Sequence, residues 1–396
     1  MKKFYLFSIL ISNLVFSQQV ATQLGSDIEG LSTDDYFGYS VGLNSAGNIL
    51  AISAPGRDEN TTENAGRVYI YQYSSNQWSN SASFSPVQSN MFFGIDLDIN
   101  AAGNIVVAGS ARENGATNVR VFENSSGAWA QKGLTLSGPN GSDFGMTVSI
   151  NKAGDIIAVG APLDEPAGGD DQGSVHIYQF QGGGNWVKIG LIYGNSTDMN
   201  FGESVSLDST GFKVAVGSPG DNNETGSVRV YNFNTQTAQW VQYGGGVNYD
   251  IQSSNFAQNV ELNDAGTTFV VGANERDDGG NSNIGEVLVY TLVNNTWAQI
   301  KTFNGAESGD ELGGGLAINQ SGSIIATGAI GHDNRKGTIR VYHANASWAQ
   351  TFTDIDGEAN NDESGYSLSM NSSGDILATG IPLSNNRTGS VEVYSL

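Results

Sequence analysis

A block of about nineteen residues recurs seven times along the chain and constrains its fold more than any other feature. Its third copy, residues 144–162, reads FGMTVSINKAGDIIAVGAP. The position after the aromatic residue falls at Gly38, Gly94, Gly145, Gly202, Ala257, Gly313 and Gly365. The Gly-Ala-Pro-like segment begins fifteen residues later in every copy. The copies are about 54 residues apart, and self-similarity at a fixed period of this size indicates a repeat architecture.

Each block predicts a β-hairpin. Residues 39–43 alternate small or polar side chains with apolar ones, which is typical of a strand. Asn44 and Gly47 then predict a turn, because Asn bonds to the nearby backbone and Gly takes a positive φ. Residues 49–53 are almost entirely apolar, which predicts a strand covered on both faces.

Two further strands complete each repeat. A pattern such as Val-x-Val-Tyr marks a third strand, first at residues 68–71 and last at residues 391–394. A fourth strand surrounds a Trp position that holds all six Trp residues of the protein: Trp78, Trp129, Trp186, Trp240, Trp297 and Trp348. Four antiparallel strands repeated seven times predict an all-β fold, a seven-bladed β-propeller.

The last copy ends after its third strand, and the N-terminus offers a candidate for the missing fourth. Residues 21–30 align without a gap on residues 348–357. We expect residues 18–30 to complete the last blade, because a ring closed by strands from both termini leaves no open sheet edge. Residues 18–396 are therefore expected to form a single propeller domain.

The first 17 residues have the pattern of a secretory signal peptide. Two Lys residues precede an apolar run over residues 4–16, and Ser17 follows it. The run is too short to span a bilayer, and the chain contains no other long apolar run. We expect a secreted or cell-surface protein without membrane insertion. The absence of Cys excludes disulfides and thiolate metal sites.

The repeated motifs also resemble those of a known family. Phe144-Gly145 together with Gly160-Ala161-Pro162 is similar to the FG-GAP signature of integrin α-chain N-terminal propellers and of many bacterial secreted proteins. The resemblance covers the chain after residue 17. It implies a seven-bladed propeller that is often stabilised by calcium and that usually serves as a ligand-binding module.

The charge of the chain is strongly acidic, with 40 acidic residues against 17 bases and a formal net charge of −23. This excess argues against nucleic acid and anionic membranes as partners. Antiparallel strands would place the loops between second and third strands on the same face as the links between blades. These two sets hold most of the acids, whereas the strands and the other face are expected to be nearly neutral. That face is the candidate surface for calcium or a cationic partner.

Calcium is the candidate cofactor, and it requires six to eight oxygen ligands. The candidate metal ligands are Asp164 and Asp170, Asp221 and Asn223, and Asp354, Asp356 and Asp362. Arg229 occupies the position where the family pattern has its final carboxylate after Asp221. The alternative is that these Asp and Asn residues form turns. Asp35, Asp143, Asp198, Asp310 and Asp362 precede the Phe-Gly position in five copies, which predicts that they hold the turn between blades.

Three functions stay open at this point. The preferred one is a non-catalytic binding or adhesion module, expected to be a monomer, that presents its acidic face to a protein or glycan. The second is a propeller enzyme with its site at the central opening, although no known catalytic motif occurs. The third is a lectin that stacks sugars on the Trp series. We expect the Trp residues to pack between blades instead, because aromatic side chains bury large areas.

Overall fold

The computed structural model describes residues 18–86, 88–111, 117–166 and 171–396. The predicted signal peptide, residues 1–17, and the candidate ligand Asp170 lie outside the described residues. Seven antiparallel sheets follow one another along the chain. The prediction of a seven-bladed β-propeller with four antiparallel strands per blade is confirmed.

The strands of each blade run in order from the innermost to the outermost. Blade 1 consists of β3 (Val41–Leu43), β4 (Ile49–Ala54), β5 (Arg67–Ser74) and β6 (Gln77–Phe84). Blade 2 consists of β7 (Phe93–Ile99), β8 (Ile105–Ser110), β9 (Asn118–Ser125) and an outer strand in two parts, β10 (Ala128–Gln131) and β11 (Leu136–Ser137). Blade 3 consists of β12 (Val148–Ile150), β13 (Ile156–Ala161), β14 (Ser174–Phe180) and β15 (Trp186–Tyr193). Blade 4 consists of β16 (Ser204–Leu207), β17 (Lys213–Ser218), β18 (Ser227–Asn234) and β19 (Gln239–Asn248).

The remaining three blades follow the same order. Blade 5 consists of β20 (Val260–Leu262), β21 (Thr268–Ala273), β22 (Glu286–Val293) and β23 (Thr296–Asn304). Blade 6 consists of β24 (Leu312–Ile318), β25 (Ile324–Ala329), β26 (Thr338–His343) and the short outer strands β27 (Ala349–Gln350) and β28 (Ile355–Asp356). Blade 7 consists of β29 (Ser367–Met370), β30 (Ile376–Ile381), β31 (Ser390–Ser395) and the short outer strands β1 (Thr22–Gln23) and β2 (Ile28–Glu29).

Helical turns occur only between strands in the described part of the chain. They are α1 (Asp221–Glu224), α2 (His332–Arg335), α3 (Ser384–Arg387) and the 3₁₀ turn η2 (Ala344–Ala346). The first three lie between the second and third strands of blades 4, 6 and 7, where this loop is shorter than in blades 1, 3 and 5. Each contains three consecutive residues with positive φ, such as Asn222, Asn223 and Glu224.

Two glycine positions of the repeat set the distance between neighbouring blades. Gly145, after Phe144, has a φ of +99°, a conformation that favours Gly. A Cβ atom added to Gly109 of the preceding blade would lie only 1.9 Å from the carbonyl oxygen of Gly145. The same distance separates a Cβ on Gly380 of blade 7 from the carbonyl oxygen of Gly38 in blade 1. The motif therefore marks a backbone contact between blades that leaves no room for a side chain.

The hydrophobic core is a ring of seven clusters, one between each pair of neighbouring blades. In each cluster, apolar residues of one blade pack against the inner strands of the next. The aromatic residue of the motif is fully buried there in blades 2 to 5, as Phe93, Phe144, Phe201 and Phe256. The cluster between blades 7 and 1 contains Ile28 and Val391 from the last blade. Burial of apolar area on this scale stabilises each blade through its neighbours.

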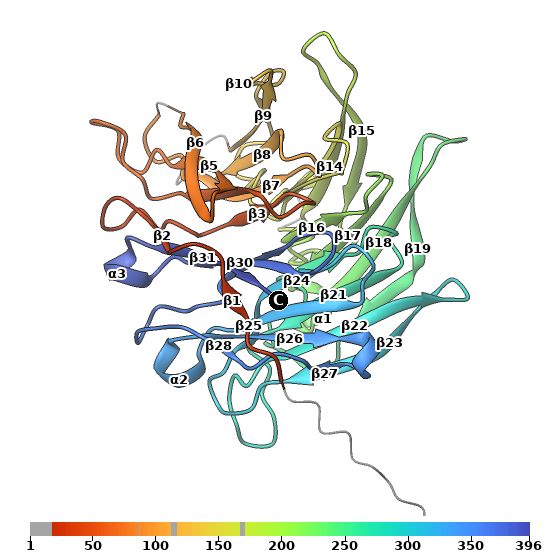
Figure 1. Cartoon of the computed structure of the whole chain (residues 1–396). Helices are drawn as coiled ribbons and strands as arrows, with labels where there is room; N and C mark the ends of the chain where they lie inside the picture. The colour runs from red at the N-terminus through yellow and green to blue at the C-terminus, as the bar shows by residue number, and fades with distance from the viewer. Residues whose placement is uncertain (1–17, 87, 112–116, 167–170) are drawn as a thin grey trace, which may run out of the picture.

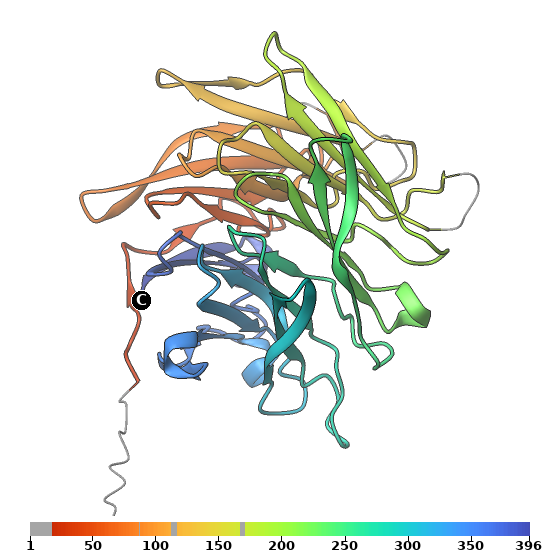
Figure 2. The same ribbon diagram turned by 90° about the vertical axis from the view of Figure 1, so that its right-hand side faces the viewer.

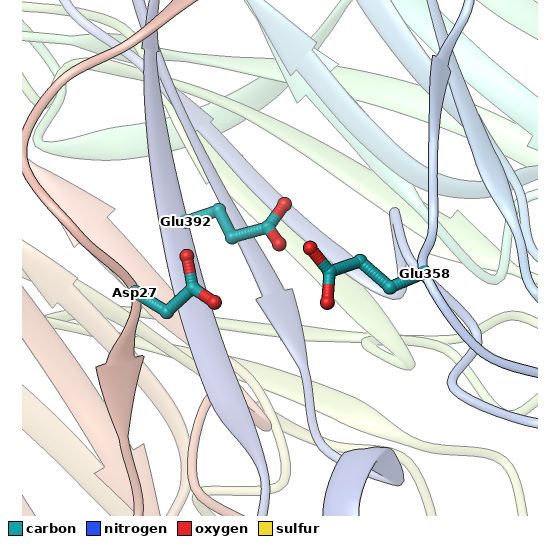
Figure 3. Close-up of side chains that lie close together, drawn as sticks. All are labelled: Asp27, Glu358 and Glu392. Atoms are coloured by element: carbon teal, nitrogen blue, oxygen red, sulfur yellow. The ribbon is translucent and has the colours of Figure 1, made fainter.

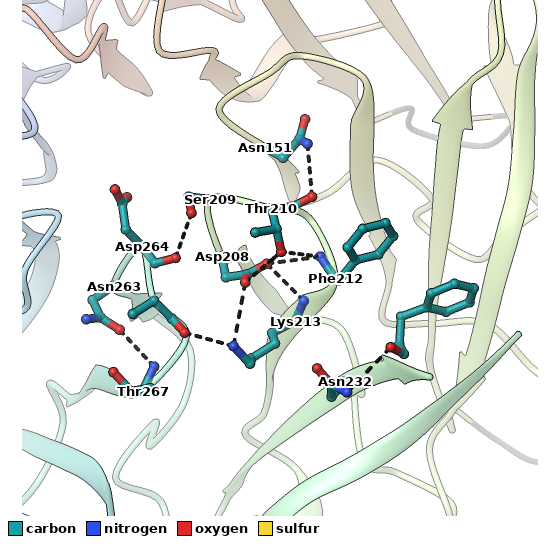
Figure 4. A network of polar contacts seen from close by, with 12 residues as sticks. Asn151, Asp208, Ser209, Thr210, Phe212, Lys213, Asn232, Asn263, Asp264 and Thr267 are labelled. Carbon is teal, nitrogen blue, oxygen red and sulfur yellow. Dashed lines mark hydrogen bonds and ion pairs between the residues drawn. The ribbon is translucent and has the colours of Figure 1, made fainter. Parts of the chain in front are cut away.

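The turn between the first and second strands is organised by one side chain in each blade. In blade 1, Oδ1 of Asn44 accepts hydrogen bonds from the backbone N–H groups of Asn48 and Ile49, both at 3.0 Å. This is the role that the sequence predicts for Asn. In blade 4, Asp208 accepts the equivalent bonds from Phe212 and Lys213 (Figure 4).

These seven turns are bonded to one another in a closed circle. The backbone N–H of the residue after each Asn or Asp donates to the carbonyl oxygen of the equivalent residue in the next blade, at 3.0–3.3 Å. The residues are, in order, Ser45, Ala101, Lys152, Ser209, Asp264, Gln320 and Ser372, whose N–H donates back to Ser45. We call this the turn ring. It joins all seven blades around the axis by backbone hydrogen bonds.

The N-terminal strands lie against the last blade. Thr22 pairs with Ser395 and Ile28 pairs with Val391, both antiparallel. In Figures 1 and 2 the red segment with β1 and β2 runs beside the blue strands of blade 7. The two short strands hold the outer position that β27 and β28 hold in blade 6. Nε1 of Trp78 in blade 1 donates to the carbonyl oxygen of Leu24 at 3.0 Å, so this segment contacts two blades.

Candidate functional site

The antiparallel strands give the propeller two different faces. The loops between second and third strands and the links between blades lie on one, which we call the loop face. The turn ring lies on the other, which we call the turn face. The described bases on the loop face are already paired with acids: Arg57 with Asp35, Arg276 with Glu286, Arg335 with Glu311 and Glu363, Lys336 with Asp333, and Arg387 with Asp34. The unpaired charge on this face is therefore acidic.

Two of the predicted calcium positions have carboxylates that already accept bonds from the adjacent strand. Asp221 accepts a hydrogen bond from Ser227 at 2.7 Å and pairs with Arg229 at 3.0 Å. Asn223 belongs to the left-handed turn in α1. In blade 3, Asp164 accepts the equivalent bond from Ser174 at 2.6 Å. The structure thus uses both Asp side chains to fasten a loop to the third strand of its blade.

The third predicted group, Asp354, Asp356 and Asp362, lies in the outer strand of blade 6 and in the link to blade 7. Nε of Arg340 lies 3.3 Å from a carboxylate oxygen of Asp354. Asp356 accepts a hydrogen bond from Thr338 at 2.7 Å. The carboxylate of Asp362 accepts the backbone N–H of Ala359 at 2.9 Å. This last bond is a turn contact, as expected for the Asp residues that precede the Phe-Gly position.

The same turn contact recurs in other blades. Asp35 accepts the backbone N–H of Ser32 at 3.0 Å, and Asp310 accepts those of Ala306 and Glu307 at 2.8 and 3.2 Å. The prediction that these Asp residues hold the turn between blades is confirmed at these three positions.

One group of three carboxylates was not predicted from the sequence. Asp27, between β1 and β2, Glu358, after β28, and Glu392, on β31, each place a carboxylate oxygen within 4.8 Å of the other two. Figure 3 shows the three side chains pointing toward one another from separate segments. They line a cavity of about 770 Å³ on the loop face, together with Glu29 and Asp362. We call this group the acidic cluster.

Burial and the neighbouring negative charges raise the pKa of one carboxyl group of the acidic cluster, Glu392. Burial raises the pKa of Glu392 to about 7, and the charges of Asp27, Glu358 and Asp362 raise it as well. A hydrogen bond of 2.6 Å from the hydroxyl of Tyr394 opposes this rise but does not cancel it. Glu392 therefore carries a proton for part of the time near pH 7, and a cation could replace that proton.

A comparison with blade 6 shows which charge the acidic cluster lacks. Asp27 and Asp354 occupy equivalent positions in the outer strands of blades 7 and 6, and Glu392 and Arg340 occupy equivalent positions in the third strands. In blade 6 these residues form the ion pair between Arg340 and Asp354. In blade 7 the same two positions hold carboxylates. Blades 2, 3 and 4 also have a base at this position of the third strand, and blades 1 and 5 have the uncharged Tyr69 and Leu288. An acid at this position is therefore particular to blade 7.

The equivalent site in blade 3 contains Ser, His and Asp but does not form a catalytic triad. Ser174, His176 and Asp164 are all buried. The hydroxyl of Ser174 donates to Asp164, and its oxygen lies 3.0 Å from Nε2 of His176. Burial, together with the charge of Lys188, lowers the pKa of His176 to about 4. A serine that donates to the carboxylate and is closed off from solvent has no route to a substrate.

The Trp series packs between blades, as expected. Nε1 of Trp186 donates to the carbonyl oxygen of Lys132 in the preceding blade at 2.8 Å, and Nε1 of Trp297 donates to that of Tyr243 at 2.9 Å. A Cβ on Gly133 would lie 2.8 Å from the Trp186 ring, so a glycine makes room for it. Trp186 and Trp297 are therefore buried in the contacts between blades, and the other four Trp residues are partly buried.

The second cavity is the central channel, with a volume of about 540 Å³ and walls formed by the innermost strands of all seven blades. Asp96 and Asp98 on β7 and Glu261 on β20 line it, with Glu203 just before β16. None of the described lining residues is Lys, Arg or His. The expected near-neutrality of the strands and the turn face was for their sum. Within that sum, the innermost strands hold acids and no base among the described lining residues of the channel.

The sequence held signals for both acidic groups. Alignment of the third strands shows Glu392 where four other blades have Arg or His, and the gapless alignment of the N-terminus sets Asp27 opposite Asp354. Alignment of the first strands similarly shows Asp96 and Asp98 as exceptions. A calcium pattern within a single loop does not reveal these residues, because their partners come from different repeats.

Comparison with known families identifies one match. The model of the FG-GAP repeat family matches residues 29–71, which run from the end of β2 to the third strand of blade 1. No curated protein matches the sequence. Within the described residues, no helix is long and apolar enough to cross a membrane.

Proposed function

We propose that this chain, a seven-bladed propeller of FG-GAP repeats, is a secreted, non-catalytic binding module that presents its loop face to a protein or glycan. Propellers of this kind typically bind partners through the loops on one face. The observation that carries the proposal is the acidic cluster beside a cavity on that face, where Glu392 holds a position that is basic in four other blades.

Calcium is the proposed aid to this binding, and the acidic cluster is its proposed position. Three carboxylates from different segments offer up to six oxygens, which is the lower end of the calcium range. The cluster joins the N-terminal segment, the link between blades 6 and 7, and β31. A divalent cation there would offset two of the three negative charges and leave the cavity positioned for an oxygen-rich ligand.

A binding experiment with matched variants tests the proposed face. The labelled chain, residues 18–396, is applied to arrays of extracellular glycans and secreted proteins with and without calcium. The loop-face variant carries Asp27→Asn, Glu358→Gln and Glu392→Gln, and the turn-face control carries Asp155→Asn and Asp375→Asn. We expect the unmodified chain and the turn-face control to bind the same ligand, and we expect the loop-face variant to lose this binding. Binding that both variants keep equally would contradict the proposal.

Calcium itself is tested by its effect on thermal stability. A ligand at 100 times its Kd stabilises the folded state by about 2.7 kcal/mol, so millimolar calcium should raise the Tm by several degrees. We expect the shift to grow between pH 6 and pH 8, because calcium must displace the proton that Glu392 holds. Glu392→Gln should remove the shift, whereas Glu29→Gln, in the same cavity, should keep most of it. The absence of any shift in the unmodified chain would remove calcium from the account.

The enzyme hypothesis has one observation in its favour, the carboxylates of the central channel. Asp96 and Asp98, however, accept backbone hydrogen bonds from the neighbouring blade, at 2.8 Å from Val148 and from Ile150. These bonds give both side chains a role in holding the inner strands. The binding module therefore remains the function that the geometry supports best.

A further inference from the structure

The central channel contains an arrangement that the proposed function does not use. Asp98 and Glu261 hold equivalent positions of their blades, two residues before the Asn that opens the turn, so they face the channel at the same depth. Asp96 lies one step further from the turn ring on the same side of β7. The three carboxylates thus face a common, narrow space at the axis.

Each carboxylate also joins its blade to a neighbour. Asp98 accepts the backbone N–H of Ile150 on β12 at 2.8 Å. Asp96 accepts the hydroxyl of Ser40, next to β3, at 3.0 Å. Glu261 accepts the hydroxyl of Ser206 on β16 at 3.0 Å. A change in the charge of these groups therefore acts on the contacts between inner strands.

No basic group balances these charges among the described residues of the channel. The titratable groups that face the three carboxylates are one another, Glu203 near β16, and the phenols of Tyr39 and Tyr366 near the loop face. β3, β12, β24 and β29 present only uncharged side chains to the channel. Lys152 in the turn ring is a base at the turn end of the blades. Its Nζ bonds to Gln320 at 3.2 Å and to Ser372 at 3.1 Å, and pairs with Asp264.

The side chain of Lys152 lies across the turn end of the channel. Its blade is the third, whereas Asp264, Gln320 and Ser372 belong to blades 5, 6 and 7, so its side chain crosses the opening. Its ammonium group is bonded to these turns rather than to the carboxylates below.

We propose that the central channel is a pH-sensitive element of the propeller: the inner strands pack tightly while Asp98 and Glu261 are protonated, and they loosen when both are ionised. This inference is independent of the loop face and of calcium. It assigns the channel a conformational role that can be measured without knowing the ligand.

The direction in which stability should change with pH follows from the pKa values of these carboxyl groups. Burial raises the pKa of Asp96 to about 6, of Asp98 to about 7 and of Glu261 to about 8, and mutual repulsion adds to the rise for the last two. Carboxyl groups of the unfolded chain have a pKa near 4. The folded state therefore binds more protons than the unfolded state, so stability is full below about pH 4 for these groups and is lost as pH rises through 6 to 8.

The test is the Tm as a function of pH from 5.5 to 9. Glu392 titrates in the same range, so all chains carry Glu392→Gln. We expect the parent to lose about 5 °C or more between pH 6 and pH 9, a direction opposite to ordinary acid denaturation. Glu261→Gln and Asp98→Asn should each reduce this loss by about half. Glu307→Gln, which removes an exposed charge from the loop face, should leave it unchanged.

A second measurement observes the protons directly. The infrared band of protonated carboxyl groups should be present at pH 7 in the parent and weaker in Glu261→Gln, which keeps its bond to Ser206. If Asp98→Asn does not fold, Glu261→Gln alone decides. A Tm that is flat or rises between pH 6 and pH 9, or a loss that both channel variants retain in full, would overturn the proposal.

Discussion

At the scale of single residues, the propeller depends on side chains that reach from one blade to the next. Trp186 is an example, since its ring packs over Gly133 and its Nε1 donates to Lys132 of the preceding blade. Asp96 and Asp98 in the channel act in the same way, because they accept backbone N–H groups from β12 of the next blade. Individual residues thus supply the polar contacts between sheets.

Trp186 gives a direct test of this role. Trp186→Ala should cost about 3–5 kcal/mol of unfolding free energy, because it empties a buried site between blades 2 and 3. Trp186→Phe should cost less, mainly the single hydrogen bond to Lys132, about 1 kcal/mol. Urea unfolding measures both. If Trp186→Ala left stability nearly intact and instead removed glycan binding, the packing role would be wrong.

At the scale of elements, the spacing of motifs was enough to predict the blades. The Phe-Gly and Gly-Ala-Pro positions recur because two backbones meet there, and that requirement is local to the sequence. Strand order, the Asn turns and the buried second strands followed from the same block. Element boundaries shifted by only a few residues, as between the predicted residues 39–43 and the observed β3.

The candidate site was less predictable, for a physical reason. The sequence around Asp164 and Asp221 shows that carboxylate oxygens are available as ligands. It cannot show that these oxygens already bond to Ser174 and Arg229. The acidic cluster depends on residues about 330 positions apart, Asp27 and Glu358, which meet only because the ring brings both ends of the chain together. A site that forms where the two ends of the chain meet can be recognised in the sequence only after the blades are aligned with one another.

At the scale of the whole molecule, the two faces differ in both charge and construction. The turn face is joined by a circle of backbone hydrogen bonds, and Lys152 crosses its opening. The loop face has variable loops, paired bases and the acidic cluster beside a cavity. The acidic cluster forms only because the pairing of the N-terminal strands with β31 brings residue 27 close to residues 358 and 392. The proposed binding surface therefore depends on the closure of the ring by the N-terminal segment.

Closure of the ring by the N-terminal segment is thus the central claim, and its removal tests it most directly. Without residues 18–30, β31 would have a free edge and Trp78 would lose its partner Leu24. The measurement compares a chain of residues 18–396 with one of residues 31–396, by thermal unfolding and by size in solution. The account predicts that the shorter chain melts at a clearly lower temperature and aggregates. A shorter chain that keeps the same Tm and stays monomeric would contradict it.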